Sequence, residues 1–222
     1  MKALNQSGPP LLGPLPRPRP ATPSELTDLS KGRGVVFLDT RRSRSDFMAG
    51  HLPGALHTPL DASFLSVVGS YVSPELPMYL IVEEHHLSRA VRALARIGLD
   101  NLAGYCPPSV LGNLPRAHLK RTPVVRFNQF AGLLNRSDIQ LLDVRAPRAY
   151  ENNHIDGALN APFLKLGEAL PRVSSDTTLL IYSQTGRRAA TASAYLERCG
   201  YNVGTVDDTY RHESTRPAAI DS

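Results

Sequence analysis

Apolar runs along the chain alternate with stretches that repeat their apolar residues at helical spacing. One run covers residues 78–82 and another covers 178–182. Helical apolar positions follow each run: Val91, Leu94 and Ile97 after the first, and Ala189, Ala192, Leu196 and Cys199 after the second. Gly98 and Gly200 stand where each helix is expected to end. Wholly apolar strands that alternate with amphipathic helices predict mostly parallel sheets with helices on both faces.

The same pattern occurs twice, which indicates an internal repeat. Each copy holds an apolar run that ends in Asp-x-Arg, then a short helical stretch with an aromatic residue, then a His-x-x-Gly-Ala-Leu motif. Equivalent residues keep nearly constant offsets: 104 from Asp39 to Asp143, 103 from His51 to His154, and 102 from Gly98 to Gly200. We therefore expect two consecutive α/β domains that arose by duplication.

Proline content sets the expected boundaries. Seven prolines lie between Pro9 and Pro23, which favours an extended segment without a core. Ordered structure is expected to begin near Thr22. The expected organisation is a proline-rich tail (1–22), domain 1 (23–106), a linker (107–122), domain 2 (123–208) and a C-terminal tail (209–222).

Composition narrows the class of protein. The chain of 222 residues has 41% hydrophobic residues, a net charge of +5 and a pI of about 9.4. The basic runs are short and tryptophan is absent, so we expect scattered surface arginines and no nucleic-acid partner. No apolar run spans a bilayer and no secretory signal is seen, so we expect a cytoplasmic protein without a membrane partner. With only Cys106 and Cys199, no disulfide framework is expected.

The repeated Asp-x-Arg and His-x-x-Gly-Ala-Leu blocks resemble the N-terminal signature of the rhodanese family. The segment 181–189 resembles that family's active-site loop, which reads strand, Cys-x-x-Gly-x-Arg, helix. The resemblance covers nearly all of residues 24–207 and implies two rhodanese-like domains, each a mostly parallel sheet with helices on both faces. It also implies a silent first copy and sulfurtransferase chemistry in the second, with no cofactor and no metal.

The resemblance places Ser183 where the family carries its persulfide-forming cysteine. Binding of the sulfur anion would fall to the residues that follow: Gln184, Thr185, Gly186, Arg187 and Arg188. Backbone N–H groups at a helix N-terminus stabilise an anion, and Gly186 permits the tight turn. Arg188 either adds a fixed charge or closes the loop by bonding its carbonyls.

A hydroxyl at position 183 has no sulfur to store and needs an adjacent base to ionise. Three explanations of Ser183 stay open: natural loss of function, an introduced Cys→Ser change, and a serine nucleophile of another kind. Asp207-Asp208, at the place of the family's Gly-Gly turn, is a further departure. A phosphatase-like use of the fold is disfavoured, because only four residues separate Ser183 from Arg188.

Other candidate residues receive structural interpretations. Cys199 is expected on the buried stripe of its helix, and Cys106 as a packed boundary residue. Glu83 is expected at the position equivalent to Ser183, and residues 83–86 (Glu-Glu-His-His) as a solvated strand end. The repeated histidines His51 and His154 are expected to orient the turn before Gly-Ala-Leu, and each Asp-x-Arg motif to form an internal pair.

Residues 1–13 are similar to the end of metallo-β-lactamase-fold persulfide dioxygenases, some of which are fused to rhodanese domains. The resulting hypothesis is a rhodanese-like protein of thiosulfate and persulfide metabolism that is inactive, or very weakly active, with Ser183. Its role would be regulatory or scaffolding, with small sulfur anions, low-molecular-weight persulfides or a persulfide dioxygenase as partners. The alternative is an active sulfurtransferase inactivated by a Cys→Ser change.

Overall fold

The computed structural model describes residues 14–129, 132–133, 136–170, 173–174 and 176–211. The chain divides into two compact units, Met1–Lys120 and Arg121–Ser222. In the described part of each unit the strands form one five-stranded sheet, and every pair of neighbouring strands is parallel. The strand order is β1-β5-β4-β2-β3 in unit 1 and β6-β10-β9-β7-β8 in unit 2, so the same topology occurs twice.

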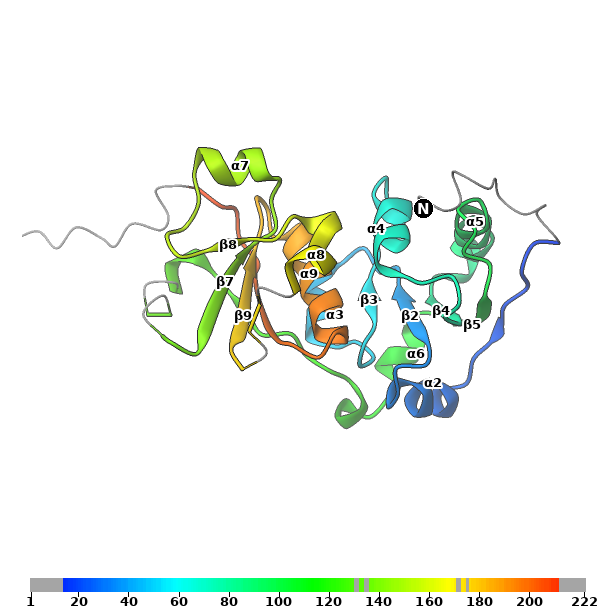
Figure 1. Ribbon diagram of the computed structural model, residues 1–222. Helices are drawn as coiled ribbons and strands as arrows, with labels where there is room; N and C mark the ends of the chain where they lie inside the picture. Colours follow the sequence, from blue (N-terminus) through cyan, green and yellow to red (C-terminus); the bar gives the residue numbers. More distant parts are fainter. Residues whose placement is uncertain (1–13, 130–131, 134–135, 171–172, 175, 212–222) are drawn as a thin grey trace, which may run out of the picture. The chain divides into compact units, whose positions relative to one another are not determined.

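Unit 1 places helices on both sides of its sheet, with α4 and α5 on one side and α2 and α6 on the other (Figure 1). Its strands are β1 (Arg19–Pro20), β2 (Val36–Asp39), β3 (Leu56–His57), β4 (Met78–Ile81) and β5 (Leu102–Cys106). Its helices are α2 (Pro23–Ser30), α3 (Arg44–Ala49), α4 (Phe64–Tyr71), α5 (Glu84–Ala95), α6 (Ser109–Gly112) and the 3-10 turn η1 (Arg116–His118). All residues of β2 and β4 are buried, as expected for strands covered on both faces.

Unit 2 has a second sheet of the same strand order. Its strands are β6 (Val124–Val125), β7 (Ile139–Asp143), β8 (Leu159–Asn160), β9 (Thr178–Tyr182) and β10 (Asn202–Val206). Its helices are α7 (Pro147–Asn152), α8 (Leu166–Ala169), α9 (Arg187–Arg198) and the 3-10 turns η2 (Phe127–Gln129) and η3 (Phe163–Lys165). Helices α7 and α9 are as long as α3 and α5, and α8 is shorter than α4. Small residues dominate the buried face of α9, which lets the helix approach the sheet closely; the Ser193 and Thr205 hydroxyls hydrogen-bond at 2.5 Å between α9 and β10.

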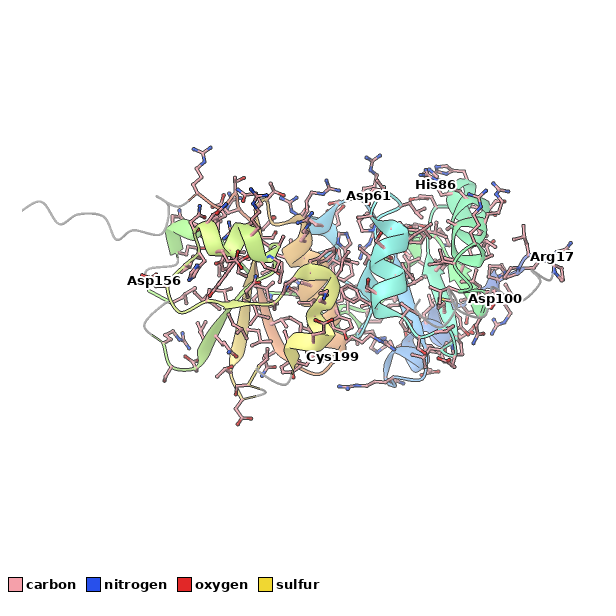
Figure 2. All side chains as sticks on the ribbon, turned by 45° about the horizontal axis from the view of Figure 1, so that its top comes forward. Arg17, Asp61, His86, Asp100, Asp156 and Cys199 are labelled. Atoms are coloured by element: carbon pink, nitrogen blue, oxygen red, sulfur yellow. The ribbon has the colours of Figure 1, made fainter. Side chains whose placement is uncertain are left out.

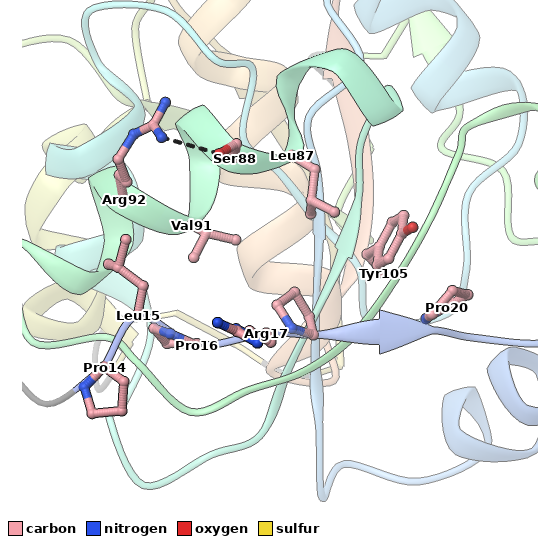
Figure 3. Close-up of a pocket in the computed structure, with 11 residues that line it drawn as sticks. Pro14, Leu15, Pro16, Arg17, Pro20, Leu87, Ser88, Val91, Arg92 and Tyr105 are labelled. Atoms are coloured by element: carbon pink, nitrogen blue, oxygen red, sulfur yellow. Dashed lines mark hydrogen bonds between the residues drawn. The ribbon is translucent and has the colours of Figure 1, made fainter.

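The proline-rich segment is part of unit 1, so the prediction that ordered structure begins near Thr22 is wrong. Strand β1 pairs with β5, and Arg19 forms an ion pair with Glu25 at 2.6 Å. Parallel pairing at a sheet edge tolerates proline, because an edge strand bonds on one side only. Figure 3 shows residues 14–20 running beside α5, with a groove of about 480 Å³ between them that Leu87 and Val91 help to line. The dioxygenase-like residues 1–13 lie outside the described residues.

The expected linker is also folded. Leu111 and Leu114 are buried, and Lys120 forms an antiparallel bridge with His51 in unit 1. The chain therefore passes from one unit to the other at Lys120/Arg121, and residues 107–120 belong to unit 1. The expected linker folds because its apolar side chains Leu111 and Leu114, three residues apart, are buried in unit 1.

Several local predictions are confirmed. Gly98 and Gly200 have φ values of 75° and 100°, the left-handed conformation that ends a helix. In each unit the Asp-x-Arg motif forms a buried or half-buried pair, with Nη2–Oδ2 distances of 2.7 Å for both Arg41–Asp39 and Arg145–Asp143. Each repeated histidine hydrogen-bonds through Nδ1 at 2.9 Å to a carbonyl four residues earlier, and its ring stacks on that residue's aromatic ring.

Candidate functional site

The loop between β9 and α9 brings the predicted site residues into one turn. Ser183 follows β9 and is buried, while Gln184 and Thr185 are exposed. Gly186 precedes α9 with φ of 75°, a conformation that costs other residues steric strain. The tight turn that was expected at Gly186 is therefore confirmed.

Ser183 turns its hydroxyl toward the start of α9. Its Oγ accepts the Ala189 N–H at 3.3 Å, and the residue is 2% exposed. Among the described residues nothing accepts the hydroxyl proton of Ser183, so no base is in place to generate an alkoxide. The side chain can bind but is not activated for attack.

Several backbone N–H groups of this turn have no acceptor among the described residues. Within the described part of the chain, the N–H groups of Gln184, Thr185, Gly186 and Arg188 have no hydrogen-bond acceptor. Four such donors in one turn, at the positive end of the twelve-residue helix α9, form a site suited to an anion. The loop can therefore hold a small anion through backbone groups alone.

Arginine side chains add positive charge at the loop. Arg187 and Arg188 are exposed at the first two positions of α9. The Arg188 guanidinium makes no hydrogen bond or ion pair with any residue that the structure describes, so closure of the loop through Arg188 is not seen. Of the two roles considered for Arg188, a fixed charge at the mouth of the loop is the one that this geometry supports.

A clamp between Gln184 and Tyr210 holds the loop against the chain segment after β10. The Tyr210 N–H donates to the Gln184 carbonyl at 3.0 Å, and the Gln184 Nε2 donates to the Tyr210 carbonyl at 3.0 Å. Tyr210 is itself buried, so the boundary expected at 208 is too early. The Tyr210 hydroxyl has no hydrogen-bond partner in the described structure.

Gly186 is also fixed by close packing against the end of β10. A Cβ at this position would lie 2.7 Å from Asp207 Oδ1 and 3.3 Å from the Val206 carbonyl oxygen. The Asp207 N–H donates to the Val125 carbonyl, while Asp208 Oδ2 accepts the Phe127 N–H. Among the described residues only glycines have positive φ, so the Asp207-Asp208 segment needs no Gly-Gly turn.

Arg145 supports the cluster behind the loop. Its guanidinium donates to both carboxylate oxygens of Asp143 and to the Asn153 carbonyl at 2.6 Å, and it lies 4.3 Å from the centre of the Tyr210 ring. Burial tends to lower the pKa of Arg145, but the hydrogen bonds and negative charge of Asp143 outweigh it, so the pKa is raised. Burial raises the pKa of Tyr182, which accepts the Ile155 N–H through its hydroxyl oxygen at 3.2 Å. These groups keep fixed charge states and act as a scaffold.

The equivalent loop in unit 1 is shorter, and the prediction for Glu83 is wrong. Asp39 pairs with Ile81 in register as Asp143 pairs with Tyr182, so Val82 occupies the position equivalent to Ser183. Val82 is buried and donates its N–H to Cys106, and α5 begins two residues later at Glu84. This loop has no glycine turn, and the N–H groups without an acceptor at the start of α5 in the described structure belong to Glu83, Glu84 and His85, two of which carry carboxylates.

The two cysteines differ from each other in burial. Cys106 is 1% exposed, and burial raises the pKa of its thiol to about 12. Cys199 follows the last residue of α9 and is half-buried, so its expected place on the buried stripe is wrong (Figure 2). The helix ends one residue before Cys199, which places the thiol at the end of α9 away from the loop.

No group of three or more His, Cys, Asp or Glu side chains in the described ranges is arranged to hold a metal ion. No helix within those ranges has the length and apolarity needed to cross a membrane.

Sequence reasoning missed Tyr210 as a partner of the loop. An aromatic residue four positions after the last strand residue is a weak signal of packing, and no sequence pattern indicates its bonds to Gln184. No sequence pattern indicates that Asp207 lies close to Gly186 either, because the pairing of the strands brings these two residues together.

Comparison with known proteins gives matches to a protein family, to curated relatives and to solved structures. The family model described as a rhodanese-like domain matches residues 127–211. The thiosulfate sulfurtransferase PspE of Escherichia coli is 32% identical over 73 residues, covering 30% of this chain and 70% of PspE. The probable adenylyltransferase/sulfurtransferase MoeZ of Mycobacterium tuberculosis is 36% identical over 66 residues, covering 29% of this chain; the match spans only 17% of MoeZ.

Solved structures were compared as well. A thiosulfate sulfurtransferase from Pseudomonas aeruginosa aligns with a TM-score of 0.39 at 19% identity, covering 92% of this chain and 46% of that protein. A rhodanese-like domain protein from Staphylococcus aureus aligns with a TM-score of 0.39 at 19% identity, covering 44% of this chain and 95% of the other. The identity to PspE over most of its length, together with the matching family model, shows that the chain belongs to the rhodanese-like family.

Proposed function

We propose that this chain is a tandem rhodanese-like protein whose second unit binds small sulfur anions without transferring sulfur. The observation that carries the proposal is the loop of unit 2, where four N–H groups without an acceptor follow a buried serine in one turn. The anion-binding part of a sulfurtransferase loop is present, and the atom that would carry the sulfur is oxygen. The role is regulation or scaffolding in thiosulfate and persulfide metabolism, with a persulfide dioxygenase as a partner.

The tandem organisation is supported by the strand order that the two units share. It is further supported by matching details at equivalent positions. The Nη2 groups of Arg41 and Arg145 both bond an aspartate two residues earlier and a backbone carbonyl nine or eight residues later. A rhodanese-like origin for unit 1 accounts for both features.

The alternative is an active sulfurtransferase in which a Cys→Ser change has occurred at position 183. Its supporting observation is that the turn keeps the left-handed Gly186 and the unpaired N–H groups although the nucleophile is gone. The codon for residue 183 in the native gene separates a natural serine from an introduced one.

The test is Ser183→Cys, assayed for sulfur transfer from thiosulfate and from glutathione persulfide to cyanide. In the variant, the thiolate would attack the outer sulfur of thiosulfate, release sulfite and hold a persulfide; cyanide would then take that sulfur as thiocyanate and restore the thiolate. The loop N–H groups and helix dipole are expected to favour the thiolate by lowering its pKa from about 8.5 toward 7 or below.

The internal repeat provides a matched control, Val82→Cys, at the equivalent position of unit 1. We expect turnover from Ser183→Cys alone and none from the parent chain or Val82→Cys, since the unit 1 loop has no glycine turn and carries Glu83 and Glu84, whose negative charge disfavours a thiolate. An inactive Ser183→Cys protein that still folds would reject the proposal that the loop is intact. Turnover by the parent chain would reject the loss of catalysis.

A further inference from the structure

The groove between residues 14–20 and helix α5 is lined mainly by apolar side chains. Leu87 and Val91 of α5 point toward the proline-rich segment (Figure 3), and Leu15 of that segment is 50% exposed. The volume of about 480 Å³ lies within the range of small-molecule pockets, about 300–1,000 Å³. Eleven residues line the groove, fewer than the roughly 20–30 a side of a protein–protein interface. Its size therefore favours a small ligand.

The segment that forms one wall of the groove is held in place before any ligand binds. Prolines at every second position from 14 to 20 fix φ there at about −65°. Strand β1, within this segment, pairs with β5. The Glu25 carboxylate accepts hydrogen bonds from the Arg19 guanidinium and from the Tyr79 hydroxyl, which ties the segment to unit 1 on a second side. A wall that is already ordered loses little conformational entropy when a ligand binds.

The charge on the lining of the groove is positive and is not balanced by acidic side chains. Arg17 and Arg92 line the groove, whereas no Asp or Glu does. In the described structure the Arg17 guanidinium makes no hydrogen bond or ion pair, and the Arg92 guanidinium donates only to Ser88 Oγ, at 3.0 Å. Residues 1–13, which precede the groove in the sequence, contain no acidic residue. Two such arginines beside an apolar lining are complementary to an apolar molecule with an anionic end.

We infer that this groove binds a small amphiphilic anion, an apolar molecule that ends in one carboxylate, sulfonate or phosphate group. Its apolar body would pack on Leu87 and Val91, and its anionic end would be bound by Arg17 and Arg92. Burial of apolar surface supplies most of the binding free energy, and the exposed arginines select for the charged end. The site belongs to unit 1, so the inference goes beyond the proposed function of the unit 2 loop and does not depend on it.

The experiment compares two probes that share an apolar body and differ in charge. Naphthalene-1-sulfonate is the anion, and naphthalene-1-sulfonamide is its neutral counterpart. Each is titrated into the full chain at constant low ionic strength, and binding is followed through the methyl NMR signals of Leu15, Leu87 and Val91. Sedimentation velocity of the same protein tests whether a second copy of the chain occupies the groove instead.

Three variants separate the apolar contribution from the charge. The double variant Arg17→Gln/Arg92→Gln removes both positive charges, and Ser88→Phe fills the groove from an exposed position of α5. Arg89→Gln is the matched control, because Arg89 is exposed on the same helix and does not line the groove. If Ser88→Phe does not fold, Leu15→Ser at an exposed position removes part of the apolar lining instead.

We expect the parent chain to be a monomer that binds the sulfonate more tightly than the sulfonamide. An exposed ion pair contributes about two- to fivefold in affinity, so the double arginine variant should weaken sulfonate binding about tenfold and change sulfonamide binding by less than about twofold. Ser88→Phe should weaken both probes, and Arg89→Gln neither.

The inference is overturned if neither probe shifts these methyl signals, or if both probes bind equally well. It is also overturned if Arg89→Gln weakens sulfonate binding as much as the double variant does, because the effect would then come from net charge alone. A dimer that Ser88→Phe dissociates would assign the groove to self-association and would reject the small ligand.

Discussion

His57 lies at the end of β3 in unit 1 and is 3% exposed. Its Nε2 hydrogen-bonds with the Arg41 carbonyl at 3.0 Å, whereas its Nδ1 has no partner in the described structure. Since a carbonyl only accepts, Nε2 carries the proton and the buried ring is neutral. Burial lowers the pKa of His57 from 6.5 to about 4, while the charge of Asp39 acts in the opposite direction.

Stability should therefore fall with acid. The pKa of this histidine is lower in the folded state than in the unfolded chain, so between pH 6.5 and about 4 the unfolded state binds more protons. The stability contribution is fully present above pH 6.5 and is lost as the pH falls toward 4. From these two values, the loss between pH 7.5 and pH 4.5 is about 2.5 kcal/mol.

The internal repeat indicates which residue should replace His57. In unit 1, His57 on β3 pairs in register with Asp39; in unit 2, Asn160 on β8 pairs in the same way with Asp143. The Asn160 Nδ2 donates to the carbonyls of Asp143 and Arg145. His57→Asn should therefore keep the hydrogen bond to Arg41 and remove the titrating group. Its stability at pH 7.5 will be lower, because the ring's packing against Phe47 is lost.

The assay is urea unfolding from pH 7.5 to pH 4.5, followed by tyrosine circular dichroism, since the chain contains eight tyrosines and no tryptophan. Hydrogen exchange of peptides from β2 and β3 assigns the change to unit 1. His118→Asn, at an exposed histidine, is the control and should keep the acid sensitivity of the parent. The reasoning is refuted if His57→Asn loses as much stability with acid as the parent chain.

Two other outcomes follow from single residues. Gly186→Ala should weaken anion binding at least tenfold and destabilise unit 2 by about 1–3 kcal/mol. The reason is that the left-handed φ is strained for alanine and that the new Cβ would collide with Asp207. Unchanged anion binding and an unchanged midpoint of urea unfolding would contradict the described turn. In the native protein a thiol reagent at pH 8 should label Cys199 much faster than Cys106, because burial raises the pKa of the Cys106 thiol to about 12. Mass spectrometry of the labelled peptides shows which of the two cysteines reacts first.

The internal repeat and the positions of the strands could be predicted from the sequence, because apolar runs mark the strands and their nearly constant offsets mark the repeat. The prediction of a strand at 178–182, followed by a glycine turn and a helix, is confirmed residue by residue, since each element has a local signal. The expected binding role of residues 184–188 remains a prediction.

The wrong predictions concern features that depend on contacts between residues far apart in the sequence. The proline segment looked extended and coreless, yet an edge strand needs bonds on one side only, so β1 joins the sheet. Glu83 was expected at the position equivalent to Ser183, but the pairing of the strands places Val82 there. The contact of Gly186 with Asp207 joins residues about twenty apart in sequence, which no local pattern reveals.

The bonds between Gln184 and Tyr210 also bear on the order in which the protein matures during translation. The loop is synthesised 26 residues before the tyrosine that holds it, and β6 has β10 as its only strand neighbour in the described sheet, about 80 residues later. Domains fold as units while the chain emerges. Unit 1 can fold on the ribosome while unit 2 still lacks its last strand, so the loop between β9 and α9 is among the last parts of the described chain to take shape. A pause or truncation before Tyr210 would leave a folded first unit joined to a second whose loop has not formed.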